Sequence, residues 1–154
     1  ITDLADALQS LGRWEEAAIR YRQAVSADKT YARAFRNVSW LLSTCPDPRF
    51  RNPNLALTAA RKAIELQGDQ EFRELDTLAA ATAAAGDPAQ AAKLMRQAIA
   101  VAPPTARAEL TERSALYAQG GKFVQATPQP AQSAIPARDP SEVRTASATG
   151  PAKR

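Results

Sequence analysis

A pattern of small and large apolar residues recurs three times along the chain with the same internal spacing. Each copy begins with alanine, has a second apolar residue four positions later, and has an alanine and an aliphatic residue at positions seven and eight. The copies are Ala17-Tyr21-Ala24-Val25, Ala56-Ala60-Ala63-Ile64 and Ala91-Met95-Ala98-Ile99. Residues at this spacing share one face of an α-helix. The pattern therefore predicts three helices, each with one apolar face.

The intervals between the copies identify a repeat. First alanines stand 39 and 35 residues apart, close to the period of about 34 residues at which paired helices repeat. A turn glycine, Gly12 or Gly86, precedes the first and third copies by five residues. The first interval is longer than this period, and the extra residues lie in 45–53, where three prolines forbid a continuous helix. Such helices bury their apolar faces only by stacking as successive hairpins.

The sequence thus predicts an all-α fold. Hairpins are expected over about 2–27, 31–66 and 71–102, and a further helix over about 105–118. Asn54 and Asp87 are the expected N-caps, with Pro88 in the first turn of its helix. The helix over 105–118 has one apolar stripe and charges elsewhere, a pattern typical of a capping helix that covers the last hairpin.

The chain divides into a domain over 1–121 and a tail over 122–154. Residues 124–154 hold five prolines and almost no large apolar side chains, so the tail is expected to be disordered. The net charge is +4, and five basic against two acidic residues from Lys122 onward supply most of it. These cations are spread thinly without interleaved aromatics, so a nucleic-acid partner is not expected.

The repeat resembles the tetratricopeptide repeat family over residues 1 to about 103, with glycine at the turns and Pro103 where the last copy ends. Lys29 and Gly68 depart from the family pattern. They stand at the ends of the first two copies, where the pattern would have proline. Residues 40–48 resemble an extended-turn variant common in bacterial repeat proteins, in which the array is often attached to a kinase, a membrane glycosyltransferase or another large chain. The resemblance implies a right-handed α-solenoid whose concave groove binds a protein or peptide.

In this family the first helix of each hairpin lines the groove, so the non-core faces of these helices hold the candidate binding residues. Phe35, Val38, Ser39 and Leu42 are the expected core positions of the middle hairpin. The candidates are Arg33, Arg36, Asn37, Trp40, Ser43, Asp6, Gln9, Ser10, Arg73 and Asp76. Trp40 is the expected main anchor with Arg33 and Arg36, because tryptophan and arginine are enriched at binding hot spots.

Plainer interpretations of these residues stay open. Trp40 could pack under the proline-rich loop or against the preceding hairpin, and the charged residues could form a solvated face. A clamp for a partner's terminal carboxylate is not expected, because Asp6 would repel the anion. The groove surface of the third hairpin consists of alanines, which offer no side chains that recognise a ligand: Ala80, Ala83 and Ala84. Another helix is therefore expected to approach there.

No residues point to catalysis. The chain has no histidine and one cysteine, Cys45, so the usual metal sites and thiol-based catalysis are not expected, and Cys45 is interpreted as an inert, half-buried thiol. No enzyme activity, cofactor, metal or small-molecule substrate is expected. No apolar run reaches the roughly 20 residues of a membrane helix. A lone cysteine favours the cytoplasm and leaves the periplasm open.

Two hypotheses for function follow. One is a non-catalytic interaction module that binds an unidentified protein or peptide in its groove. The other is structural: the chain is the C-terminal cap of a longer array in a larger bacterial protein, with recognition upstream. The second is suggested because Ile1 is not methionine and already lies in a helical pattern.

Overall fold

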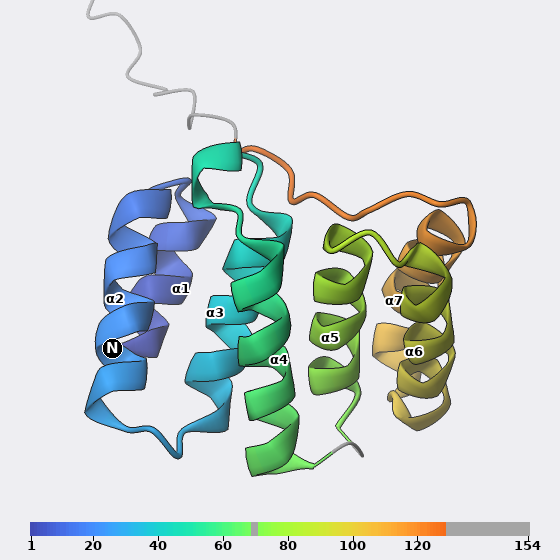
Figure 1. Cartoon of the computed structure of the whole chain (residues 1–154), viewed down its shortest axis with the longest axis horizontal. Coiled ribbons are helices and arrows are strands. Elements are labelled where there is room, and N and C mark those ends of the chain that lie inside the picture. Colours follow the sequence, from blue (N-terminus) through green and yellow to red (C-terminus); the bar gives the residue numbers. More distant parts are fainter. Residues whose placement is uncertain (69–70, 129–154) are drawn as a thin grey trace, which may run out of the picture.

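The computed structural model describes residues 1–68 and 71–128, and this part of the chain is entirely helical, without a β-strand (Figure 1). The helices are α1 (Thr2–Ser10), α2 (Trp14–Ala27), α3 (Ala32–Thr44), the 3-10 turn η1 (Pro48–Phe50), α4 (Pro53–Gln67), α5 (Phe72–Ala84), α6 (Pro88–Val101) and α7 (Pro104–Ala118). Their outer bounds lie within one residue of the ends that the sequence predicts for each hairpin and for the last helix.

Consecutive helices run in opposite directions and pack in pairs, α1 with α2, α3 with α4 and α5 with α6, while α7 packs on α6 (Figure 1). Ion pairs and hydrogen bonds join α1 to α3, α3 to α5 and α5 to α7. We call the surface made by these four helices the odd-helix face. All four run upward in Figure 1, so their C-terminal ends lie at the same edge of the molecule.

The turn glycines end three of these helices in the same way. Gly12, Gly86 and Gly120 have φ values of +74°, +100° and +80°, which favour glycine. After each, the next N–H donates to a carbonyl five positions earlier, closing the helix end as in a Schellman motif. Gly120 follows Gly86 by 34 residues. By position and ending, α7 is therefore equivalent to the first helix of a hairpin.

The helix N-caps were predicted only in part. Asp87 caps α6, because its Oδ1 accepts from the N–H of Gln90 at 2.9 Å, and Pro88 stands in the first turn as expected. The prediction of Asn54 as the cap of α4 is wrong. Asn52 is the cap, with its Oδ1 accepting from the N–H of Leu55 at 3.1 Å. Pro53 starts the helix earlier, since its fixed φ suits the first helical position.

The core between the helices is built largely from alanine. Its buried clusters place larger side chains at a few points, such as Tyr21, Leu41 and Met95, and Trp14 packs at the edge of the first cluster as a packing residue would. Ser39 is buried as expected, whereas Phe35, Val38 and Leu42 are only partly buried. Small residues at the contacts let the helices approach closely.

The two ends of the row of helices differ. At one end Leu110 and Tyr117 of α7 are buried in the same cluster as Ala83 of α5, whereas Ala80 and Ala84 are not members of it. At the other end Leu4 of α1 and Leu11, the residue that follows α1, are 50% and 68% exposed. An apolar side of α1 therefore has no covering element within the described residues.

After α7 the chain turns back as an extended segment, residues 121–128, which we call the strap. It runs along the C-terminal ends of the odd helices (Figure 1) and contacts α7, α3 and α1 through Phe123 and Gln125. Phe123 and Gln125, which belong to the expected disordered tail over 122–154, thus have defined contacts. The rest of that expected tail, 129–154, lies outside the described residues.

Candidate functional site

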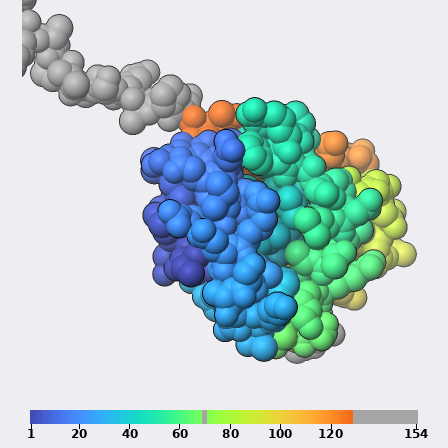
Figure 2. Space-filling view, turned by 60° about the vertical axis from the view of Figure 1, so that its left-hand side comes forward, coloured from blue at the N-terminus to red at the C-terminus, as the bar shows by residue number. Residues whose placement is uncertain are grey.

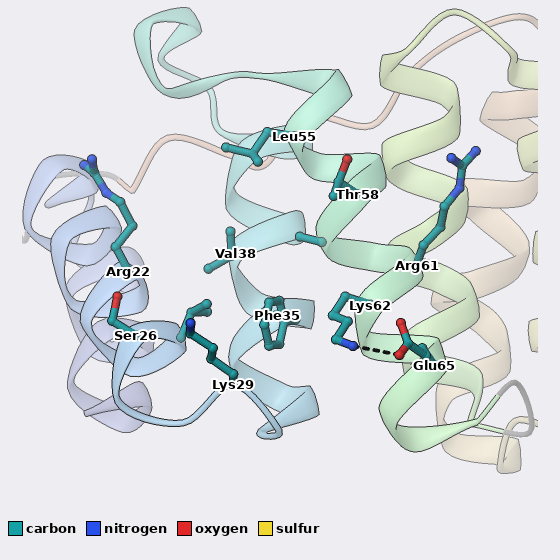
Figure 3. A pocket seen from close by; sticks show the side chains of 12 residues that line it. Arg22, Ser26, Lys29, Phe35, Val38, Leu55, Thr58, Arg61, Lys62 and Glu65 are labelled. Atoms are coloured by element: carbon teal, nitrogen blue, oxygen red, sulfur yellow. Dashed lines mark hydrogen bonds and ion pairs between the residues drawn. The ribbon is translucent and has the colours of Figure 1, made fainter.

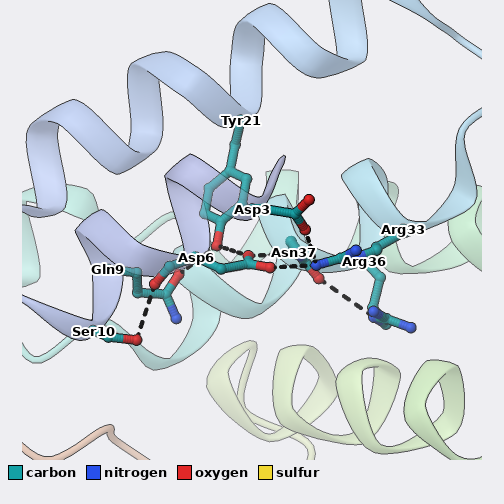
Figure 4. A network of polar contacts seen from close by, with 8 residues as sticks. All are labelled: Asp3, Asp6, Gln9, Ser10, Tyr21, Arg33, Arg36 and Asn37. Carbon is teal, nitrogen blue, oxygen red and sulfur yellow. Dashed lines mark hydrogen bonds and ion pairs between the residues drawn. The ribbon is translucent and has the colours of Figure 1, made fainter. Parts of the chain in front are cut away.

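Asp6 is the centre of the polar network on the odd-helix face (Figure 4). One of its carboxylate oxygens accepts from the hydroxyl of Tyr21 at 2.6 Å and from the amide of Asn37 at 2.8 Å. The other accepts from the guanidinium of Arg33 at 2.6 Å. Three donors, one of them a cation, therefore bind a carboxylate that has about four acceptor sites. The residue expected to repel an anion is therefore neutralised by neighbours on α2 and α3.

The same network favours one protonation state in two of its members, Arg33 and Tyr21. Arg33 also pairs with Asp3 at 2.8 Å, and the hydrogen bond to Asp6 is the main cause that raises the pKa of Arg33. Burial, followed by the hydrogen bond to Asp6, raises the pKa of Tyr21. Tyr21 thus stays a neutral donor and Arg33 a cation.

Arg36 joins the middle of the face to α5. Its guanidinium lies 3.1 Å from a carboxylate oxygen of Glu74, which is only 3% exposed, and 3.4 Å from the side-chain oxygen of Asn37. A buried carboxylate needs a paired cation to offset its lost hydration. The role that the contacts give Arg36 is therefore to balance Glu74.

Asp76 and Arg113 form the most buried ion pair of the face. Arg113 donates to both oxygens of Asp76, at 3.0 and 2.8 Å, and to Glu109 at 2.7 Å. Burial raises the pKa of the Asp76 carboxyl, and the two contacts with Arg113 oppose that rise. The paired geometry fixes both orientation and distance. This pair ties α7 to α5.

Trp40 packs against the strap. Its ring centroid lies 5.6 Å from that of Phe123, and the guanidinium carbon of Arg113 lies 5.5 Å from the Trp40 ring and 5.4 Å from the Phe123 ring. These separations are those of an aromatic pair and of cation–π contacts. Trp40 is therefore held by an aromatic residue of the same chain that the sequence analysis did not single out.

Gln125 fixes the strap two residues further on. Its backbone N–H donates to the carbonyl of Thr44 at 2.8 Å, at the end of α3 where helix carbonyls lack partners. Its side-chain amide donates to the Thr44 hydroxyl at 2.7 Å and accepts from Gln9 at 3.0 Å. Both the backbone and the side chain of this segment are therefore bound.

The structure brings seven of the ten candidates together around one depression of about 250 Å³. They are Asp6, Gln9, Ser10, Arg33, Arg36, Asn37 and Trp40, joined there by Tyr21.

The remaining three candidates lie elsewhere. The expectation that Ser43 faces the groove is wrong: it is 1% exposed and donates to the carbonyl of Ser39 at 2.8 Å, within its own helix. Asp76 is 8% exposed beneath Arg113, so it does not face a groove either. Arg73 is exposed and lies 4.8 Å from the ring of its neighbour Phe72.

Cys45 is completely buried rather than half-buried, and burial raises the pKa of its thiol. The side chains described in residues 1–68 and 71–128 contain no group of three or more Cys, Asp or Glu placed to hold a metal ion. In the same ranges no helix has the length and apolarity needed to cross a membrane.

No protein-family model matches this chain, and a search of curated proteins likewise finds no match.

Proposed function

We propose that this chain is a non-catalytic interaction module: a short array of tetratricopeptide-like hairpins whose odd-helix face binds an extended segment of a partner protein. One observation carries the proposal. The strap, an extended segment of the same chain, already lies on this face with an aromatic side chain on Trp40 and a glutamine on Thr44. A partner segment with similar residues would find the same contacts.

The strap contacts divide recognition into two parts. The backbone bond from Gln125 to the Thr44 carbonyl is independent of side-chain identity, whereas Phe123 against Trp40 selects an aromatic residue. Extended peptides are commonly held in this way, with main-chain bonds for affinity and side-chain contacts for specificity. The proposed ligand is a segment with an aromatic residue two positions before glutamine.

The ion pairs change which residues we assign as anchors. Arg33 and Arg36 balance carboxylates of their own chain. A partner that recruited Arg36 would leave the buried Glu74 unpaired, at a cost of about 1 to 3 kcal/mol. Trp40, Gln9 and Thr44 make the contacts that a ligand could exchange with the strap. We assign recognition to these three.

The test adds the strap as a separate peptide. A fluorescent peptide of residues 119–128 is added to the full chain carrying Phe123→Ala and Gln125→Ala, which frees the face, and binding is followed by anisotropy. We expect saturable binding that is at least tenfold weaker to the unaltered chain, because the attached strap competes at high effective concentration.

Two controls make this test decisive. The same peptide with alanine in place of Phe123 should bind at least tenfold more weakly, and adding Trp40→Ala to the protein should abolish binding while circular dichroism shows retained helix. If the freed chain bound neither peptide, or bound both equally, the face would not be a peptide-binding surface.

A structural role is the second candidate, favoured by the exposed apolar side of α1. Ile1, Leu4 and Leu11 are at least half exposed, while α7 covers the opposite end. In a longer array a preceding helix would bury this side. Leu4→Ser with Leu11→Ser should then reduce binding of a hydrophobic dye and leave the urea midpoint nearly unchanged. A large fall in that midpoint would place both leucines in the core of this chain.

A further inference from the structure

A second surface, separate from the odd-helix face, lies between α2 and α4. The two helices stand on either side of α3, and the furrow between them is visible between the blue and green surfaces in Figure 2. Its main cavity has a volume of about 750 Å³ (Figure 3). A smaller cavity of about 270 Å³ towards η1 shares Arg22, Val38 and Leu55 with it. We call the joined cavities the even-helix groove.

The floor of the even-helix groove is apolar. Phe35 and Val38 of α3 point into it (Figure 3), Val25 comes from α2, and Leu55 and Ala59 come from α4. Phe35 and Val38 are only partly buried, and Leu55 is 51% exposed. Phe35 and Val38 are two of the positions that the sequence analysis assigned to the core. Within the described residues this apolar floor has no covering element.

The rim of the groove is basic. Six of its lining residues are cations, and the single acidic lining residue, Glu65, is paired with Lys62 at 2.7 Å. Arg49 is paired with Asp47. The four other cations form no ion pair within residues 1–68 and 71–128: Arg22, Lys29, Arg51 and Arg61. The rim therefore carries uncompensated positive charge.

Arg51 adds a second sign of an absent acceptor at the η1 end. One guanidinium nitrogen donates to the carbonyl of Pro46 at 3.1 Å, but its Nε is buried and has no hydrogen-bond partner among the described residues. A buried donor without an acceptor costs about 1 to 3 kcal/mol. A carboxylate at this end of the groove would pair with the charge of the Arg51 guanidinium.

We infer that the even-helix groove binds an acidic amphipathic helix of a partner protein. Along α4 the groove extends from Leu55 to Glu65, which at about 1.5 Å per residue is roughly 15 Å, or about three turns of a helix laid beside it. Helix-in-groove binding places an apolar face on such a floor. Acidic residues on the flanks of that helix would face the cations of the rim.

The charge of the groove argues against the tail of this chain as the occupant. Residues 129–154 contain four basic and two acidic residues, so their net charge has the same sign as the rim. A segment from another protein with net negative charge fits the potential, and a like-charged one is repelled.

The probe for this inference is a capped 14-residue peptide with leucine at helical spacing on one face and glutamate on the flanks. Two matched peptides serve as controls: one with the same composition rearranged so that no face is apolar, and one with lysine replacing glutamate. Titration of the full chain should give binding of the first peptide at least tenfold tighter than of either control, with a gain in peptide helicity. Affinity should fall as salt rises from 50 to 300 mM.

Variants on the protein locate the binding. Arg22→Glu with Arg61→Glu should weaken binding of the acidic peptide at least tenfold, and Leu55→Ser should weaken it severalfold. Arg20→Glu with Arg96→Glu changes the net charge equally at exposed positions outside the groove and should leave the affinity within twofold.

Three outcomes would overturn the inference. They are equal binding of the rearranged peptide, equal loss of affinity in both charge-reversal variants, and absence of peptide binding while decanoate binds and shifts the resonances of Phe35 and Val38. The last would assign the groove to a small anionic amphiphile instead of a protein helix.

Discussion

Arginines and aromatic residues occur both on the odd-helix face and along the even-helix groove, but the structure treats them differently. On the odd-helix face Arg33, Arg36 and Arg113 each have a carboxylate partner on another helix, and Trp40 has Phe123. Along the groove Arg22 and Arg61 have no ion-pair partner in the described part of the chain, and Phe35 is partly exposed.

The comparison separates structural charge from available charge. A cation that balances a buried carboxylate stabilises the helix packing, and removing it leaves an uncompensated ion. An exposed cation without a partner contributes little to folding and keeps its full field for a ligand. The two faces should therefore respond oppositely to substitution: the first through stability, the second through binding.

The largest effect is expected at Arg113. Arg113→Ala leaves Asp76 buried without a cation, so the free energy of unfolding should fall by about 3 to 5 kcal/mol. Urea denaturation followed by circular dichroism measures this. Replacing both partners, Asp76→Leu with Arg113→Met, should recover most of the loss. A fall below about 1 kcal/mol in the single variant would mean that the odd-helix face is not held by this pair.

Alkaline pH should weaken the same face. Burial raises the pKa of Tyr21 and of Tyr117 above the usual value, so the folded chain keeps both protonated while the unfolded chain ionises them from about pH 10. Their contribution is complete below about pH 10 and is lost above it, by roughly 1.4 kcal/mol per pH unit for each tyrosine. Urea midpoints between pH 8 and 11 measure the slope, which Tyr21→Phe with Tyr117→Phe should reduce.

The hydroxyls of the two tyrosines should contribute differently to the free energy of unfolding at neutral pH. The hydroxyl of Tyr21 donates to Asp6, whereas that of Tyr117 is buried with no hydrogen-bond partner in the described residues. Tyr21→Phe should lower the free energy of unfolding by about 1 to 2 kcal/mol, and Tyr117→Phe should be neutral or stabilising. Equal losses in the two variants would show that packing alone, rather than the polar network, holds the tyrosine on this face.

Much of the helical arrangement follows from local signals that a single sequence carries. Alanine spacing gives the apolar faces, and glycine or proline at residues such as Gly86 and Pro88 gives the helix ends. These signals placed the outer bounds of each hairpin and of α7 to within one residue. They failed at the cap of α4, where two asparagines flank Pro53 and the choice between them depends on where the proline starts the helix.

The partners of the candidate residues could not be predicted in this way, because they depend on which helices become neighbours. Asp6 pairs with Arg33, which is 27 positions away in the sequence, and Arg113 pairs with Asp76, which is 37 positions away. Phe123 was missed since it is followed by a segment rich in proline and small polar residues, a composition that predicts disorder. An isolated aromatic residue just after a helix-ending Gly-Gly pair was the available signal.

The strap offers a smaller test of the odd-helix face. Phe123→Ala removes the ring that packs on Trp40, so the free energy of unfolding should fall by about 1 kcal/mol. Tryptophan emission should shift to longer wavelength as Trp40 gains contact with water. Val124→Ala, at an exposed position of the same segment, is the matched control and should change neither quantity. An unchanged emission in Phe123→Ala would show that the strap does not shield Trp40.

The smallest effect is expected on the other side of the molecule. Arg61→Ala removes an exposed cation that forms no ion pair in the described residues, so the free energy of unfolding should change by less than about 0.5 kcal/mol. The same urea titration used for Arg113→Ala measures it. A loss as large as that of a paired arginine would mean that the charge of the groove serves the fold. A near-zero change, combined with weaker binding of the acidic peptide, would leave ligand binding as the role of that charge.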